Sequence, residues 1–220
     1  MLKGISSPSS SLPYIIPFVL FLALTGVTPY IPGEAIWVYP FKTILVAFLL
    51  FKFRHVYSEI QPRSSLLAFL VGLGVFIIWI LPDRLGWSYP LLGEISEFNP
   101  YDRIQPRNLA FVWIAFRLVG ASVVVPVMEE IFWRSFLIRY LIKPNFKEVA
   151  IGAFSWLSFV VTVLLFGGEH IRWGVGIAAG IIYNLLLYRT KSVFACILAH
   201  AVTNLALGIY VLITQQWMYW

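Results

Sequence analysis

Two adjacent acids and an arginine stand in the middle of an apolar stretch of this sequence. Glu129 and Glu130 follow the apolar run 123–128, and Arg134 comes one turn later. A charge at the centre of a bilayer costs roughly 2.5–3.5 kcal/mol even on lenient insertion scales, so each charge must be paired or used. On a helix Glu130 and Arg134 face each other, whereas Glu129 is turned about 100° away from Glu130. One acid can therefore be neutralised while the other is left for chemistry, although a purely structural ion pair also explains the pattern.

The chain has three histidines, and two of them, in or at the end of apolar stretches, are candidates for a catalytic role. His55 lies in a basic segment and is expected to be solvated. His170 ends the stretch 166–170, and taken alone it fits a structural residue at a helix end. His200 and Asn204 are one turn apart inside an apolar helix, where lipid offers no hydrogen-bond partners. Both must find partners within the protein.

Antiparallel packing would bring these polar residues to one depth in the membrane. Glu129 and Glu130 lie near the start of their helix and His170 ends the next one, so the two ends meet on one side. His200 and Asn204 then lie roughly 12–18 Å into the last helix, at 1.5 Å of rise per residue. Unrelated structural pairs have no reason to share a depth. The coincidence favours a single functional site, in which a carboxylate in apolar surroundings is a good general base.

The composition is that of an integral membrane protein. Of the 220 residues, 60% are hydrophobic and 12% are charged, against about 45–50% and 25% in soluble domains. The net charge is +6, but the basic residues stand at the ends of apolar runs. We interpret them as topology determinants and lipid contacts, and we expect no nucleic-acid partner.

Apolar stretches suited to membrane-spanning helices recur along the whole chain. We expect helices at about 12–31, 36–53, 65–81, 109–125, 129–142, 149–166, 173–188 and 193–213. Pro126 either starts a new helix or kinks a long one, so the fold class is an all-α polytopic transmembrane bundle of seven or eight helices. Lys42 either snorkels to the surface or faces the bundle interior. The polar segment 83–108, with Trp87 and Tyr89, is expected to lie along the interface.

The basic segments also indicate an orientation. If the Pro126 region is one kinked span, the segments 52–63, 139–147 and 189–191 share one side, which the positive-inside rule makes cytoplasmic. The polar residues around His170 then open toward the non-cytoplasmic half of the membrane.

Three motifs in this order resemble those of the CAAX prenyl protease and bacteriocin-processing (CPBP) family of intramembrane proteases. They are Glu129-Glu130 with Arg134, Phe166 with His170, and His200 with Asn204. The resemblance covers roughly 109–213. We therefore divide the chain into 1–108, N-terminal transmembrane helices and an interfacial loop without a recognised motif, and 109–215, a CPBP-like catalytic helix core. The sequence around 130–134 is also similar to the bacterial branch found beside exosortase systems.

The resemblance implies hydrolysis of a peptide bond in a membrane-attached or hydrophobic substrate. It implies that Glu129 is the general base that activates a water, helped by His170. It also implies that His200 and Asn204 stabilise the oxyanion of the tetrahedral intermediate. Glu130 and Arg134 would be the supporting pair. A CAAX-type enzyme works on cytoplasmic substrates, which conflicts with the orientation indicated by the basic segments.

The metal requirement stays open at this stage. Glu129, His170 and His200 are a possible zinc set, because two histidines and a carboxylate are known zinc ligands. The zincin pattern His-Glu-xx-His is absent, and we favour a reaction without a cofactor.

Two other functional classes also fit buried carboxylates and histidines. One is a proton- or ion-coupled transporter, which would use them as a proton relay; the other is a non-catalytic CPBP-like scaffold or immunity protein. We expect an enzyme in the lipid bilayer of a bacterial inner membrane, with a membrane-bound peptide or protein substrate and a possible exosortase-type sorting system as partners.

Overall fold

The computed structural model describes residues 11–31, 36–63, 65–87, 92 and 97–220, and every regular element in these ranges is helical. Tyr89, which we expected at the interface, lies outside the described residues, whereas Trp87 is 60% exposed. The first helices are α1 (Leu12–Val27), α2 (Val38–Phe53), α3 (Leu66–Arg84) and α4 (Pro100–Arg103). The later helices are α5 (Arg107–Val119), α6 (Val125–Glu130), α7 (Ile138–Tyr140), α8 (Trp156–Gly168), α9 (Trp173–Thr190) and α10 (Val193–Thr214). Short 3₁₀ turns follow α1 and α2, precede α8 and end the chain.

The stretch around Pro126 is one continuous helix. Two π-helical segments, Gly120–Val124 and Ile131–Leu137, join α5, α6 and α7 into a single helix of 34 residues, Arg107–Tyr140. At 1.5 Å per residue this helix is about 51 Å long. Pro126 therefore does not separate two spans. Counted this way, the described residues form eight helices, and the predicted all-α bundle is confirmed.

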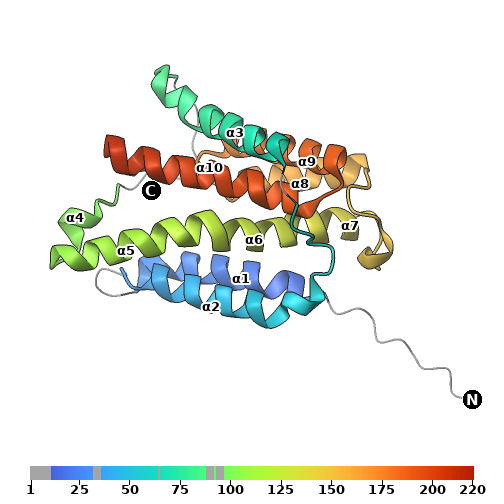
Figure 1. The fold of residues 1–220 in the computed structure, drawn as a ribbon, viewed down its shortest axis with the longest axis horizontal. Coiled ribbons are helices and arrows are strands. Elements are labelled where there is room, and N and C mark those ends of the chain that lie inside the picture. The colour runs from blue at the N-terminus through green and yellow to red at the C-terminus, as the bar shows by residue number, and fades with distance from the viewer. Residues whose placement is uncertain (1–10, 32–35, 64, 88–91, 93–96) are drawn as a thin grey trace, which may run out of the picture.

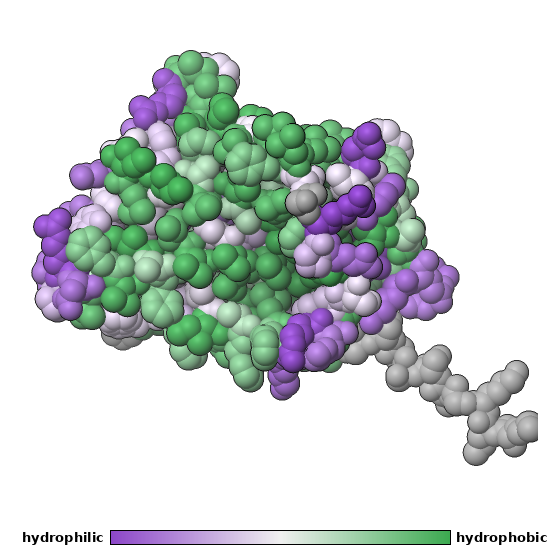
Figure 2. Space-filling view, in the orientation of Figure 1, coloured by the Kyte–Doolittle hydropathy of each residue, from purple (hydrophilic) through white to green (hydrophobic). Residues whose placement is uncertain are grey.

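Among the residues that the structure describes, four helices are long and apolar enough to cross a membrane: Leu12–Tyr30, Leu66–Arg84, Arg107–Tyr140 and Val193–Thr214. Figure 2 shows a broad apolar surface between polar ends. Many large apolar side chains of the protein are exposed, among them Phe48 and Leu70. The chain is therefore an integral membrane protein. Helix α8 has 13 residues and is about 20 Å long, which is short of the roughly 30 Å hydrocarbon core. The turn that carries His170 is thus held within the bundle.

The helices pack as antiparallel pairs around the long α5–α7 helix (Figure 1). The α1–α2 hairpin covers one side, while α10 and α3 pack together on the other and α8 pairs with α9. Serine N-caps begin three of these helices: Ser65 for α3, Ser155 for α8 and Ser192 for α10. Gly176 and Gly180 allow the close approach of α9 to α8, as their spacing predicted.

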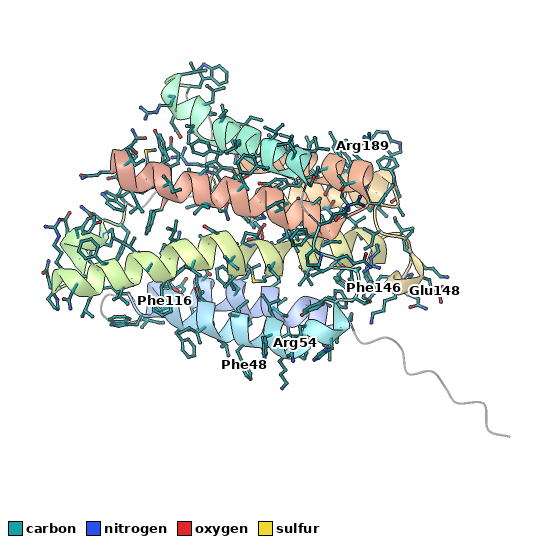
Figure 3. The ribbon with its side chains drawn as sticks, viewed as in Figure 1. Phe48, Arg54, Phe116, Phe146, Glu148 and Arg189 are labelled. Atoms are coloured by element: carbon teal, nitrogen blue, oxygen red, sulfur yellow. The ribbon has the colours of Figure 1, made fainter. Side chains whose placement is uncertain are left out.

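The basic loops gather at one end of the bundle. Arg54, Glu148 and Arg189 all lie toward the end where α2 and α7 finish (Figure 3), and α4 and the last turn of α10 lie at the opposite end (Figure 1). Because the stretch through Pro126 is a single helix, the three basic segments fall on one side of the membrane, as the orientation argument required. The positive-inside rule therefore predicts that the end with the basic loops is cytoplasmic.

Close packing of α3 on α10 depends on Gly72, which gives the first prediction. A Cβ there would meet the carbonyl oxygen of Ala199 and lie 2.8 Å from Cβ of Val202, whereas a Cβ on Gly74 would have nothing within 4 Å. Gly72→Ala should lower the thermal unfolding temperature in detergent. Gly74→Ala, the matched control, should leave it unchanged or raise it, because alanine favours a helix over glycine by about 1 kcal/mol. Equal effects of the two variants would contradict this packing.

The orientation gives a second prediction, tested by cysteine labelling in a Cys196→Ala background. Asn108, in the first turn of α5, and Lys147, next to Glu148, are both exposed. The start of α5 and Glu148 lie at opposite ends of the bundle (Figures 1 and 3). Asn108→Cys should react with a membrane-impermeant reagent added to intact cells, and Lys147→Cys should react only after permeabilisation. The reverse labelling pattern would show the opposite orientation, with the α4 end of the bundle in the cytoplasm.

Candidate active site

A single buried carboxylate connects two of the three motifs. Oε1 of Glu130 accepts a hydrogen bond from Nη1 of Arg134 at 3.1 Å and lies 2.9 Å from Nδ1 of His200. Glu130 is 0% exposed, Arg134 1% and His200 5%. The predicted pairing of Glu130 with Arg134 is therefore present, and the same oxygen also holds His200 in place.

Aromatic rings enclose the guanidinium of Arg134. Its Cζ lies 4.4 Å from the ring centre of Phe166 and 5.4 Å from that of Tyr183. A planar guanidinium stacks well on aromatic faces, which offset part of its lost hydration. Tyr183 also stacks on the His200 ring, with centroids 5.3 Å apart and planes at 25°. Phe166, the first residue of the second motif, thus helps to stabilise the positive charge of Arg134, which belongs to the first motif.

The helix that carries both acids departs from α-helical geometry on either side of them. The two π-helical segments flank α6, whose last two residues are Glu129 and Glu130. Such bulges are frequent at functional sites because they change the direction in which side chains point. Pro126 has no N–H to donate, so carbonyls one turn before it lack their usual donor. Nδ2 of Asn204 donates to one of these carbonyls, that of Ala121, at 2.8 Å.

Glu129 is the acid left free. It is 7% exposed, and its Oε2 atom is buried without a hydrogen-bond partner. It faces a cavity of about 350 Å³. Five of the seven motif residues line this cavity: Glu129, Phe166, His170, His200 and Asn204. The sequence argument that these residues converge is consistent with this arrangement.

Hydrogen bonds fix which nitrogen of each histidine carries the proton. Nδ1 of His170 lies 2.7 Å from the carbonyl oxygen of Phe166. A carbonyl only accepts, so this bond assigns the proton of neutral His170 to Nδ1 and leaves the Nε2 lone pair free. Nδ1 of His200 likewise donates to the carboxylate of Glu130. Both imidazoles therefore have Nε2 available for a substrate or a water.

Sequence reasoning missed Glu169. Both of its carboxylate oxygens are buried without a hydrogen-bond partner, and the residue lines the same cavity as Glu129. The two carboxylates are near enough to repel each other electrostatically. The signal was present, because an acid in an apolar turn beside His170 carries the same energetic cost as Glu129. The family motif has no position for this acid.

The donors present do not form a metal site as they stand. Within the described ranges, no group of three or more His, Cys, Asp or Glu side chains is arranged to hold a metal ion. We therefore derive no step through zinc, and the metal requirement is a matter for the chelator experiment below.

Fold and site together define an integral membrane protein whose helices surround a largely apolar cavity that contains acids and histidines. Residues 111–206 match the family model described as type II CAAX prenyl endopeptidase Rce1-like. Over this stretch, which holds all three motifs, the predicted resemblance to the CAAX prenyl protease family is confirmed. The exosortase-associated branch stays a prediction. Searches of curated proteins and of solved structures found no match to the chain.

The buried pair gives a third prediction. Glu130→Gln should leave Arg134 without its counter-charge and His200 with only a neutral acceptor, and losing one member of a buried pair costs about 3–5 kcal/mol. The variant should unfold at a clearly lower temperature or denaturant concentration than wild type. Glu148→Gln removes an acid that pairs with Lys143 on the surface, and this control should unfold like wild type. Equal stability of the two variants would show that the Glu130 pair is not holding the bundle together.

Proposed function

We propose that the protein is an intramembrane endopeptidase that hydrolyses a peptide bond in a membrane-attached or hydrophobic substrate. The observation that carries this proposal is Glu129, a buried carboxylate with a free oxygen beside a cavity that His170 also lines. The family match favours hydrolysis over a transporter or a non-catalytic scaffold, because the matched family is named for endopeptidases.

In the proposed reaction, Glu129 and Nε2 of His170 hold one water molecule. Glu129 takes a proton from this water while the water oxygen attacks the carbonyl carbon of the substrate, and a tetrahedral oxyanion forms. The proton then passes to the amine nitrogen as the C–N bond breaks, giving a new carboxylate and a free amine. Glu169 supplies a second carboxylate in the same cavity, which we propose carries that proton to the leaving nitrogen.

His200 and Asn204 would stabilise the oxyanion. Asn204 uses one of its two amide N–H groups on Ala121 and keeps the second. His200 can offer Nε2–H when it carries a second proton, and the carboxylate of Glu130 on its other nitrogen would balance that charge. Donors placed where negative charge develops are often the largest single contribution to such catalysis.

The fourth prediction concerns the proposed base. Glu129→Gln and His170→Ala should each lower the cleavage rate by about 10²–10⁴-fold, the range for general acid–base groups. Both variants should insert and unfold like wild type, because neither side chain neutralises the buried arginine. The assay uses purified protein in vesicles, an acylated randomised peptide pool and mass spectrometry of the products. A wild-type rate in either variant would contradict the assignment.

Two controls accompany this assay. Glu148→Gln changes an exposed acid and should leave cleavage unchanged. A chelator should also leave the rate unchanged in this scheme, whereas loss of cleavage with the chelator and recovery with zinc would replace it with a metal-dependent one. The setting of the reaction, a bacterial inner membrane with an exosortase-type system, is likewise our proposal.

A further inference from the structure

The segment 215–220 lies across one end of the bundle. Helix α10 ends before Gln215, whose φ of +57° is in the left-handed region that favours glycine, and the chain turns there. The 3₁₀ turn Trp217–Tyr219 follows. In Figure 1 this part of the chain, marked C, lies between α10 and α5 at the end of the bundle that also carries α4. The segment is therefore beside two of the helices that line the cavity of Glu129.

Two side chains of this segment form the boundary between the cavity of Glu129 and two further hollows. Trp220 lines the cavity and also a second hollow of about 530 Å³, whose wall includes α4 and the turn after α1. Tyr219 lines the cavity and also a third hollow of about 550 Å³ at the end of α3. Moving these two side chains would join the cavity to the hollows outside it.

The other described residues that the cavity shares with these hollows belong to long helices. They are Thr25 in α1, and Tyr39 and Lys42 in α2. Lys42 is 6% exposed and donates to Oγ1 of Thr25 at 2.6 Å, so it faces the bundle interior and does not snorkel. Within the described part of the chain, the movable part of this boundary is therefore Tyr219 and Trp220.

One carboxylate fastens the segment to the turn that carries His170. The hydroxyl of Tyr219 donates to Oδ2 of Asp83, at the end of α3, at 2.7 Å. Arg172, two residues after His170, donates to the same oxygen, and its Cζ lies 4.6 Å from the ring centre of Tyr219. The Asp83 side chain is 23% exposed, so water can replace Tyr219 as its donor. This connection can therefore open without leaving a buried charge unpaired.

The remaining contacts of the segment are aromatic. The rings of Trp217 and Tyr101 on α4 have centroids 5.8 Å apart, and those of Trp220 and Trp113 on α5 are 6.5 Å apart. Nε1 of Trp220 is buried with no acceptor among the described residues, so this packing leaves one donor uncompensated. No backbone hydrogen bond between described residues joins 216–220 to α3, α4 or α5. Side chains alone therefore hold the segment against these three helices.

We propose that the segment 215–220 is a lid over the cavity of Glu129, which turns at Gln215 and is held closed by Asp83. When Tyr219 leaves Asp83, Trp220 moves off the boundary and the cavity becomes continuous with the hollows at the α4 end. Substrate enters by this route, and closure afterwards separates the reaction from bulk water. The role in substrate entry rests on the proposed peptidase function, whereas opening of the lid can be tested without cleavage.

Opening is measured first, as the reaction rate of a cysteine inside the cavity. Leu207 lines the cavity from α10, and Leu207→Cys is made in a Cys196→Ala background. A small, charged, water-soluble thiol reagent is added to the purified protein, and mass spectrometry follows the modification. Adding Tyr219→Phe removes the hydroxyl that binds Asp83 and keeps the ring. The reaction should become at least about tenfold faster, because hydrogen bonds to charged groups are among the stronger ones in proteins.

Two controls separate opening of the lid from general loosening. Tyr57→Phe removes a hydroxyl that donates to the carbonyl oxygen of Pro13 at 2.7 Å, and it should leave the reaction of Leu207→Cys unchanged. Native Cys196 is fully buried within the hydrophobic core, and Tyr219→Phe should leave its reaction rate unchanged. Equal reaction of Leu207→Cys with and without Tyr219→Phe would overturn the lid.

A reversible cross-link then tests the lid as the route of entry. Tyr101→Cys and Trp217→Cys, again with Cys196→Ala, are joined by a short bifunctional thiol reagent that a reducing agent cleaves. Cleavage of the acylated peptide pool should fall at least about tenfold on cross-linking and recover on reduction. Unchanged cleavage by the cross-linked protein would overturn entry through the lid. Faster labelling with Tyr219→Phe, but no cleavage by any preparation, would support the lid and overturn the peptidase function.

Discussion

The sharing of one buried carboxylate determines how this site is built. Glu130 neutralises Arg134 on its own helix and holds His200 from α10 with the same oxygen. Because that oxygen satisfies both partners, the adjacent Glu129 has no structural charge to balance. The two acids therefore have different roles: Glu130 stabilises the bundle, and Glu129 keeps an oxygen without a hydrogen-bond partner at the cavity. Removing water from such groups is costly, so the arrangement persists only while the aromatic rings around Arg134 and His200 stay packed.

Parts of the chain outside the family match complete the cavity. The matched segment 111–206 supplies the motif residues, but α1 and α2 supply the wall with Lys42 and Thr25. Hydrogen bonds also connect the segment that follows α2 to the long helix: Nη2 of Arg139 donates to Glu59 at 3.1 Å, and Ser135 hydrogen-bonds the same carboxylate. The α1–α2 hairpin therefore closes the cavity on the side where Lys42 lies, so the unmatched part of the chain shapes what the site can accept.

The sequence was informative where a charge in an apolar stretch had a partner at helical spacing. The link between Glu130 and Arg134 followed from four-residue spacing, and the common depth of His170 and His200 followed from antiparallel order. Glu169 was missed because no spacing rule pairs it with Glu129, which is forty residues earlier. Whether Pro126 divided a helix was undecided, since a proline can kink or end one; the π-helical segments that keep the helix continuous depend on tertiary packing and on the donor from Asn204.

A double-mutant cycle on Glu130 and Arg134 tests the central claim most directly. Unfolding free energies are measured for Glu130→Gln, Arg134→Met and the combined variant, with cleavage measured on the same preparations. Breaking a buried pair is costly, whereas replacing both partners is often nearly neutral. The combined variant should therefore be more stable than the sum of the single effects by at least about 1 kcal/mol, yet cleave poorly because His200 has lost the carboxylate that would balance its charge. Additive single effects, or a combined variant that cleaves at the wild-type rate, would contradict the account.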